Sequence, residues 1–432
     1  MSSRAMIKKQ LLYGFYRFLH PLVAIALRIF YRRITLTHGE FLQQKGPFIY
    51  VSNHPNTLID PFMVAIHSSR ILHFLANAGL FDSRFGFWFF STFYCFPIQR
   101  SIDKVSRQIN NNHSFDRMAA FLAGGGVLFV APEGGSEVGR YIKPLRTGTA
   151  RVALNTAAGE DWQTELAILP VGLVYEAPFR FRSRAWVNVG EPIRVAAYRE
   201  AYEADPFQAV RQLTDETEAR LKNLTLDTPD EEEALLLDRL AQILYNLYPA
   251  DFPTVVEKIK GIQQNWTSRA PGEVKRVGHY FSELALLDLS DLSIQQWQRG
   301  PYRSFAAMVL GFPLFLWGLL NNLLIVLLAE LPLKLTGIYP TYHGTVRFLA
   351  GFFGVLLFYP VQYLLVAGNF GFLFGVAYLS SLIPSGLFAA FFVRKWKTWL
   401  ELLRVRRMIT SHPDKLASLK KDRQSIIADW QL

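Results

Sequence analysis

Residues 48–60 read Phe-Ile-Tyr-Val-Ser-Asn-His-Pro-Asn-Thr-Leu-Ile-Asp, and the rest of the chain is organised around this stretch. Its apolar start predicts a short buried strand over 47–52, and the proline that follows ends strand pairing. A helix is expected over 58–68, with Asn56 or Thr57 as its cap. A strand tip that leads into a helix places side chains at a sheet edge, where ligands of open α/β sheets bind.

His54 and Asp60 are the candidate catalytic residues of this stretch. An imidazole accepts and releases a proton near neutral pH, and a neighbouring carboxylate holds it in one tautomer and stabilises the imidazolium. Their spacing does not put both groups on one face of a helix, so His54 is expected to precede the helix. The alternative is a loop histidine whose hydrogen bond serves only the fold.

Composition indicates a protein that meets lipid. The chain has 432 residues, of which 50% are hydrophobic, and a formal net charge of +11. This length allows two or three domains. A basic chain without a helix-turn-helix, zinc finger or RNA-binding sheet motif favours a membrane surface or a phosphate-bearing substrate over nucleic acid. The single cysteine, Cys95, excludes an internal disulfide and a multi-cysteine metal site.

Between residues 46 and 200 the pattern alternates strand and helix, which is typical of an α/β layer fold. The expected strands cover 47–52, 71–76, 93–98, 126–131, 166–174 and 185–189, with helices at 58–68, 105–123 and 147–158.

Three further motifs follow strand ends: Pro97-Ile98-Gln99-Arg100, Pro132-Glu133-Gly134-Gly135-Ser136 with Lys143 and Arg146 downstream, and Leu169-Pro170-Val171. Glycine turns let backbone N–H groups approach an anion, and a guanidinium group supplies a forked donor for phosphate. Each motif alone is weak, because a glycine turn after a strand is more often only a turn; their order and combination are the specific signal.

In this order, the four motifs resemble the blocks of the glycerolipid acyltransferase family, which includes glycerol-3-phosphate and 1-acylglycerol-3-phosphate acyltransferases. The resemblance covers residues 46–195. Five residues separate His54 from Asp60 where most members have four. Gly-Gly-Ser at 134–136 replaces the Gly-Thr-Arg of many members; both features are similar to the fungal glycerol-3-phosphate branch.

The resemblance implies an α/β acyltransferase domain, a mixed sheet flanked by helices, with His54 as general base and Asp60 beside it. It also implies substrate-binding residues that hold the glycerol phosphate: Arg100, Glu133, Gly134, Gly135 and Ser136. The downstream basic residue of the third block falls at either Lys143 or Arg146.

Five segments are expected along the chain. Residues 1–45 form a membrane-associated amphipathic segment, with a helix that only covers the domain as the alternative, and Pro21 is expected to bend or split it. The α/β domain covers 46–200, and a helical connector covers 201–300, with a helical segment that lies on the membrane as the alternative. Thr228 is expected to cap a helix with proline at its first position.

The last two segments are transmembrane or re-entrant helices at 301–395 and a basic cytoplasmic tail at 396–432. Residues 305–329 and 348–393 carry no charge, which is long enough to cross a bilayer. Placing every charged end on one side favours two hairpins, one that turns at Asn321-Asn322 and one that turns near residues 368–371. The alternative is three full spans, which would carry the basic tail to the other side. Without residues 301–432, the α/β domain is expected to stay folded and bound to membranes through its N-terminal segment, with reduced but measurable activity.

The sequence thus predicts a membrane-bound enzyme of phospholipid synthesis. It would move an acyl group from acyl-CoA or acyl carrier protein to glycerol 3-phosphate or lysophosphatidate, on the cytoplasmic face of the inner membrane if bacterial. Membrane lipids are expected partners and nucleic acid is not; no cofactor and no metal are expected, since no cluster has ligand spacing. The alternative is a non-catalytic membrane protein whose domain binds lysophospholipid or scaffolds partners.

Overall fold

The computed structural model describes residues 3–99, 110–248, 251–265, 270–298 and 301–432, which form two compact units. The first unit comprises Met1–Thr228 and Tyr339–Phe348, and the second comprises Pro229–Ile338 and Leu349–Leu432. These units differ from the five segments expected from the sequence. In particular, Tyr339–Phe348, which lies within the segment 301–395 expected to form membrane helices, is part of the first unit.

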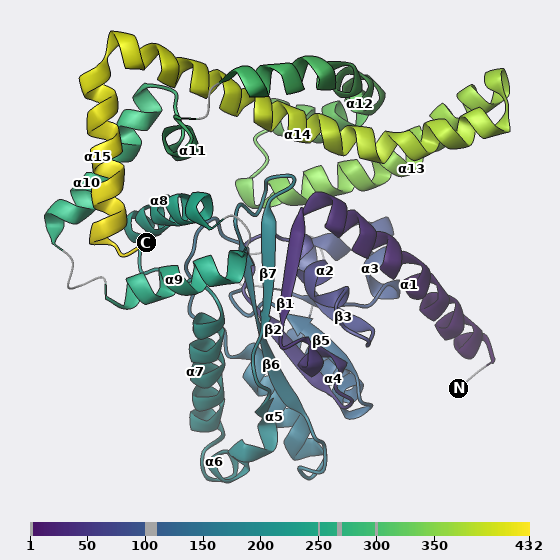
Figure 1. The fold of residues 1–432 in the computed structure, drawn as a ribbon. Helices are drawn as coiled ribbons and strands as arrows, with labels where there is room; N and C mark the ends of the chain where they lie inside the picture. Colours follow the sequence, from purple (N-terminus) through teal and green to yellow (C-terminus); the bar gives the residue numbers. More distant parts are fainter. Residues whose placement is uncertain (1–2, 100–109, 249–250, 266–269, 299–300) are drawn as a thin grey trace. The chain divides into compact units, whose positions relative to one another are not determined.

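The described part of the first unit is built on one sheet of eight strands in the order β1-β7-β6-β2-β5-β3-β4, with β8 beside β6 (Figure 1). In chain order these strands are β1 Arg33–Thr37, β2 Phe48–Ser52, β3 Leu72–Asn77, β4 Cys95–Ile98, β5 Val127–Val130, β6 Ala167–Tyr175, β7 Arg184–Val189 and β8 Ile193–Arg194. Central β2 runs parallel to both β5 and β6, whereas β7 and β8 run antiparallel to β6. The sheet is therefore mixed, as expected.

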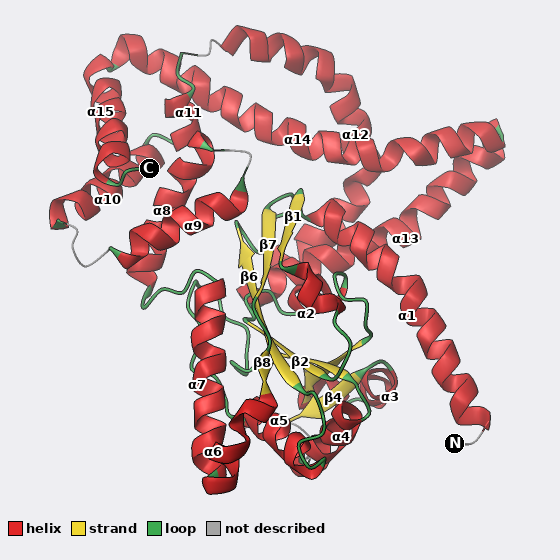
Figure 2. Ribbon diagram, turned by 60° about the horizontal axis from the view of Figure 1, so that its bottom comes forward, coloured by secondary structure: helices red, strands yellow, loops and turns green. Residues whose placement is uncertain are grey.

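Helices flank this sheet (Figure 2). They are α1 Ser3–Phe30, α2 Ile59–Ala65, α3 Arg84–Thr92, α4 Asn111–Ala123, α5 Gly148–Gly159, α6 Arg199–Ala204 and α7 Pro206–Leu224. Side chains alternate along a strand, so Ile49 and Val51 of β2 enter a core shared with α4, α5 and α7. All five β2 residues are buried. The tip of this strand is therefore fixed from both faces.

The six strands expected from the sequence are confirmed, within a few residues at their ends. Two short strands, β1 and β8, and the aromatic helix α3 were not predicted. The expected cap of α2 is wrong: Leu58 is its N-cap, and neither Asn56 nor Thr57 caps it with a side chain. Asn56 and Thr57 instead form a turn, in which Thr57 has a φ of 36°.

Helix α1 is continuous through Pro21 and is not split there. Its C-terminal part packs onto the unit, since Ala24, Leu27 and Phe30 are buried. Its earlier part leaves large apolar side chains exposed, namely Ile7, Leu11, Tyr13, Phe15 and Phe18. The expected amphipathic segment is thus a helix with one packed end and one apolar, exposed end.

The second unit begins with four helices, α8 Glu231–Leu247, α9 Phe252–Gln264, α10 Pro271–Leu286 and α11 Asp291–Gln295. The carboxylate of Asp291 is fully buried and accepts hydrogen bonds from Arg423 at 2.7 Å, from Tyr280 at 2.8 Å and from Asn246 at 2.7 Å. Arg423 belongs to α15 (Pro413–Asp429). The expected basic tail is therefore helical and packs on the connector.

The predicted start of α8 is wrong by two residues. Asp230 is the N-cap, and its side chain accepts the N–H of Glu233 at 2.8 Å. Thr228 instead donates its hydroxyl to the carbonyl of Arg140 at 3.0 Å, within the first unit.

In the described residues, three helices are long and apolar enough to cross a membrane: Phe305–Leu335, Pro340–Phe370 and Phe372–Ser411. They belong to α12 Pro301–Leu335, α13 His343–Phe370 and α14 Phe372–Ser411. Because α12 continues through Asn321 and Asn322, the expected re-entrant turn there is wrong. The expected turn near residue 370 is present at Gly371, whose φ is 93°.

Polar side chains join these three helices in the second unit. Tyr359 donates to Asn322 Oδ1 at 2.7 Å, Tyr378 donates to Asn321 Oδ1 at 2.5 Å, and Gln362 donates to the carbonyl of Asn321 at 3.1 Å. In an apolar surrounding such groups hold helices together, because an unpaired polar group there is costly. Asn321 and Asn322 thus join helices and do not turn the chain.

Candidate active site

His54 and Asp60 come together at the tip of β2. His54 lies in the loop that follows the strand, and Asp60 lies in the first turn of α2, where its carboxylate is fully buried. His54 Nδ1 is 3.0 Å from Asp60 Oδ2. The side chain of His54 keeps 21% of its surface exposed. With its Nδ1 proton held by the carboxylate, the ring offers the lone pair of Nε2 to a ligand.

Two further donors fix the Asp60 carboxylate. The backbone N–H of Asn56 donates to Oδ2 at 2.7 Å, and the hydroxyl of Tyr175 donates to Oδ1 at 2.7 Å. Burial, followed by the negative charge of Asp60, raises the pKa of Tyr175 well above its ordinary value, so this hydroxyl keeps its proton. With its position set by these bonds, Asp60 can orient the imidazole of His54 through Oδ2.

Glu133 ties the glycine turn after β5 to His54. Its Oε1 accepts the backbone N–H of His54 at 3.0 Å, and its Oε2 accepts the backbone N–H of Lys143 at 3.2 Å. Burial raises the pKa of Glu133 from 4.5 to about 7, against the lowering effect of these two N–H groups. Both carboxylate oxygens are thus engaged by the protein, and Glu133 holds two loops together beside the base.

Of the two downstream basic residues, Arg146 is the available cation. A Cβ placed on Gly134, whose φ is 76°, would lie 2.5 Å from Nε of Arg146, so the guanidinium group covers the glycine turn. The structure gives Arg146 no ion-pair partner within the described ranges. The ammonium group of Lys143 is paired with Glu137.

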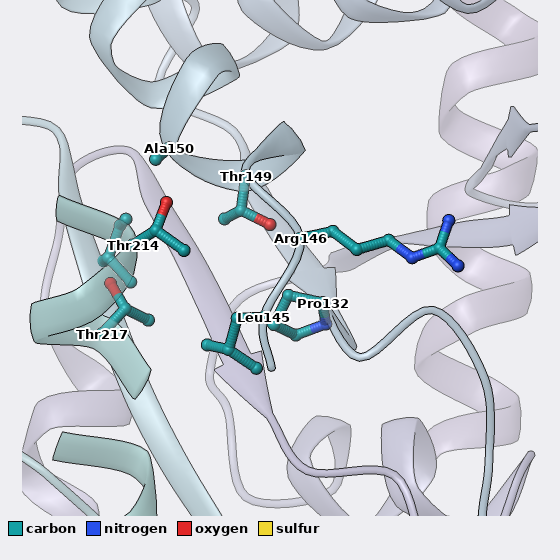
Figure 3. Close-up of a pocket in the computed structure, with 8 residues that line it drawn as sticks. Pro132, Leu145, Arg146, Thr149, Ala150, Thr214 and Thr217 are labelled. Carbon is teal, nitrogen blue, oxygen red and sulfur yellow. The ribbon is translucent and has the colours of Figure 1, made fainter. Parts of the chain in front are cut away.

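A small pocket beside this turn is lined by residues that include Arg146, Thr214 and Thr217. In Figure 3 the side chain of Arg146 points away from the two threonines. These two threonines donate their hydroxyls to carbonyls of their own helix at 2.7 and 2.6 Å. The threonine hydroxyls are therefore already bonded within α7. The guanidinium group of Arg146 lies over the glycine turn and not in the pocket.

The other predicted residues are partly placed. Gly135 and Ser136 follow Gly134 in the same half-buried turn. Arg100 lies outside the described residues. Burial raises the pKa of the Cys95 thiol to about 12, so this thiol stays protonated and is not a nucleophile. In the described residues no group of three or more His, Cys, Asp and Glu side chains could hold a metal ion.

Several site residues were missed by sequence reasoning. Asn53 was quoted as part of a motif but given no role; its side chain exchanges two hydrogen bonds with the backbone of Leu173, at 2.9 and 2.8 Å. Tyr175 lies 115 residues from Asp60 in the sequence, and no local signal links them. The position of Tyr175 at the end of a buried strand adjacent to β2 was the available clue.

The similarity to known proteins lies in the same α/β region of the chain. Residues 33–174 match the family model described as Acyltransferase. Glycerol-3-phosphate O-acyltransferase 2 of Saccharomyces cerevisiae is 33% identical over 143 residues, which are 33% of this chain and 19% of that protein. Glycerol-3-phosphate O-acyltransferase 1 of the same yeast is 29% identical over 154 residues, 35% of this chain and 20% of that protein. The chain therefore matches about a fifth of the length of these relatives.

Among solved structures, the 1-acyl-sn-glycerophosphate (LPA) acyltransferase PlsC of Thermotoga maritima matches with a TM-score of 0.36 and 14% identity. The match covers 52% of this chain and 83% of that chain.

Proposed function

We propose that this chain, whose residues 33–174 match the acyltransferase family model and two glycerol-3-phosphate O-acyltransferases, is a glycerolipid acyltransferase that transfers a fatty acyl group to a hydroxyl of glycerol 3-phosphate. The contact that carries this proposal is His54 Nδ1 to Asp60 Oδ2 at 3.0 Å, with the imidazole partly exposed and the carboxylate buried. A base oriented in this way suits removal of a proton from an alcohol.

In the proposed reaction, His54 Nε2 takes the proton of the acceptor hydroxyl as its oxygen attacks the thioester carbonyl of acyl-CoA or acyl carrier protein. The tetrahedral intermediate then loses the thiolate, which takes the proton back from the imidazolium. The products are the ester and the free thiol. This direct transfer needs no acyl-enzyme and no cofactor, and a positioned base contributes about 10²–10⁴-fold to its rate.

The proposed phosphate-binding group is the guanidinium of Arg146 over the glycine turn at Gly134. A guanidinium group that has no carboxylate partner among the described residues can offer a forked pair of donors to a phosphate, in contrast to the paired ammonium of Lys143. Gly135 and Ser136 continue this turn, and Arg100 remains a second phosphate-binding residue expected from the sequence.

Glycerol 3-phosphate is proposed as the acceptor because both yeast relatives carry that substrate in their names, and because Gly-Gly-Ser at 134–136 is similar to that branch. Lysophosphatidate is the second acceptor of the family to be tested. We place the reaction at a membrane, with the domain on the cytoplasmic face. The three apolar helices and the exposed apolar end of α1 support a membrane location.

The direct experiment incubates the purified full-length protein in detergent–lipid micelles with labelled acyl-CoA and each acceptor in turn, and repeats both with labelled acyl carrier protein. We expect labelled lysophosphatidate from glycerol 3-phosphate. Labelled phosphatidate from lysophosphatidate alone would replace the proposed acceptor. If no labelled lipid forms with either acceptor and either donor, the proposed function is wrong.

A further inference from the structure

A segment from late in the chain, Tyr339–Phe348, forms part of the compact unit that contains the candidate site. It consists of a 3-10 turn, Pro340–Tyr342, followed by the start of α13 at His343. The matched acyltransferase region ends at residue 174 and does not include it. We call Tyr339–Phe348 the docking segment.

The docking segment is anchored by its last two residues. Phe348 is 3% exposed, and its ring centroid lies 6.1 Å from that of Phe30 in α1 and 6.4 Å from that of Phe62 in α2. Arg347 donates to the carbonyl of Phe179 at 2.9 Å. Because α2 also carries Asp60, the segment packs on the helix that positions the carboxylate.

The segment also contacts the turn between His54 and Asp60. The hydroxyl of Thr345 lies 2.5 Å from the hydroxyl of Thr57 and accepts the N–H of Leu58 at 3.3 Å. Thr57 has a φ of 36°, a conformation that a β-branched residue adopts only when its surroundings impose it. Thr345 is 9% exposed, so its hydroxyl makes buried hydrogen bonds to this strained turn.

This turn leads directly to the carboxylate. Asn56, the residue before Thr57, donates its N–H to the same Oδ2 that faces His54. A Cβ on Gly344 would come within 2.9 Å of the carboxamide atoms of Asn56, so the docking segment approaches Asn56 as closely as a glycine allows. A shift of the docking segment would therefore move one of the donors that fix Asp60.

We propose that the docking segment is a positioning element of the active site, and that Thr345 is a positioning residue for His54 and Asp60. The inference rests on the proposed function, because it gives the segment a role in acyl transfer. It also gives a reason for reduced transfer without residues 301–432, because that deletion removes the docking segment, whose second half is the start of the apolar helix α13.

The test compares Thr345→Val with Thr345→Ser in the full-length protein. Valine keeps the shape and removes the hydroxyl, whereas serine keeps the hydroxyl. We expect Thr345→Val to lower kcat about fivefold to tenfold, as for loss of one buried hydrogen bond. KM for both substrates should stay within about twofold, and Thr345→Ser should recover most of kcat. Thr336→Val is the control, because Thr336 lies just after the end of α12 and, in the part of the chain that the structure describes, its hydroxyl donates to the carbonyl of Pro332 and contacts neither Thr57 nor Leu58.

A second measurement does not depend on turnover. In protein with ¹⁵N-labelled histidine, the ring resonances of His54, assigned with His54→Gln, should shift in Thr345→Val and not in Thr336→Val. If the wild-type protein transfers no acyl group but these resonances shift, the proposed function fails and the positioning contact stands. If the resonances and kcat of Thr345→Val equal those of the wild type, the inference is wrong.

Thr57→Gly covers the case in which Thr345→Val does not fold. Glycine adopts a positive φ without strain and removes the Thr57 hydroxyl, which lies 2.5 Å from the hydroxyl of Thr345 and donates to the carbonyl of Thr341 at 3.4 Å. We expect a loss of kcat similar to that of Thr345→Val, and the two losses should add only in part in the double variant, because both remove the contact between the hydroxyls of Thr57 and Thr345. Wild-type kcat in Thr57→Gly would overturn the inference.

Discussion

The hydroxyl of Tyr175 donates to Oδ1 of Asp60 at 2.7 Å, joining residues that lie 115 positions apart in the sequence. Tyr175 is the last residue of β6, and Asp60 lies in the first turn of α2, so the fold of the sheet brings the two side chains together. The other carboxylate oxygen faces His54. The buried tyrosine thus fixes the side of Asp60 that the histidine does not reach.

Replacing Tyr175 with Phe should therefore lower kcat about threefold to tenfold, because Asp60 loses one of its hydrogen bonds and orients His54 less firmly. KM should change little, since Tyr175 is buried away from substrates. Tyr50→Phe is the control, because that hydroxyl is also in the buried sheet and donates to the carbonyl of Leu42 at 3.3 Å. Equal kcat in Tyr175→Phe and the wild type would show that the hydrogen bond from Tyr175 does not contribute to the orientation of Asp60.

Arg146 and Lys143 provide a matched pair for the acceptor site. Arg146→Ala should raise KM for glycerol 3-phosphate about tenfold or more and leave KM for the acyl donor within about twofold, because a charged hydrogen bond to phosphate is lost. Lys143→Ala should change either constant less than about twofold, since its ammonium group is already paired with Glu137. Steady-state kinetics on both substrates measures this. If the lysine variant has the larger acceptor defect, the phosphate lies elsewhere in the site.

Glu133 should make stability depend on pH. The folded protein holds this proton up to about pH 7, whereas the ordinary pKa is 4.5, so between these values the folded state binds more protons than the unfolded chain. The free energy of unfolding attributable to Glu133 therefore falls as pH rises through this window. Glu133→Gln removes the dependence. The difference in Tm between Glu133→Gln and the wild type should thus move in favour of the variant from pH 5 to pH 8.

The amide introduced by Glu133→Gln can accept only one of the two backbone N–H groups, so the variant also carries a constant penalty. The sign of the trend, measured by thermal unfolding in detergent at several pH values, is the test. A Tm difference that stays constant, or moves in favour of the wild type as pH rises, would contradict the raised pKa.

The packing of α12 on α14 gives a test in the second unit. A Cβ on Gly318 would collide with the carbonyl oxygen of Ser385, and Ala389 lies 3.2 Å from the same position. Gly318→Leu should lower the free energy of unfolding by about 1–3 kcal/mol or separate the helices. Gly351→Leu in α13 is the matched control, because nothing lies within 4 Å of its Cβ position. Equal Tm values for the two variants in detergent would show that α12 and α14 do not pack in this way.

The sequence was most informative where local pattern decides structure. The run 48–52 is apolar on both faces, and it forms the buried central strand β2. The spacing of His54 and Asp60 required the histidine to precede the helix, and it does. β1 was not predicted, because its pairing with β7 depends on residues about 150 positions away and its own sequence is half polar.

The rest depended on contacts that no local pattern encodes. Asn56 and Thr57 had the side chains of helix caps, but the docking segment and Asp60 hold them in a turn instead. The uncharged stretch around Asn321 was compatible with a turn, and its asparagines pair across helices instead. Tertiary hydrogen bonds overrode local propensity in both cases.

The central claim is that His54 is the base of an acyl transfer, and the turnover of His54→Gln tests it most directly. The assay uses labelled acyl-CoA with glycerol 3-phosphate, and a wild-type Tm shows that the variant is folded. We expect turnover to fall at least about 100-fold, because a positioned base contributes about 10²–10⁴-fold, while binding of glycerol 3-phosphate is retained. A folded His54→Gln protein that keeps half or more of the wild-type turnover would contradict the account.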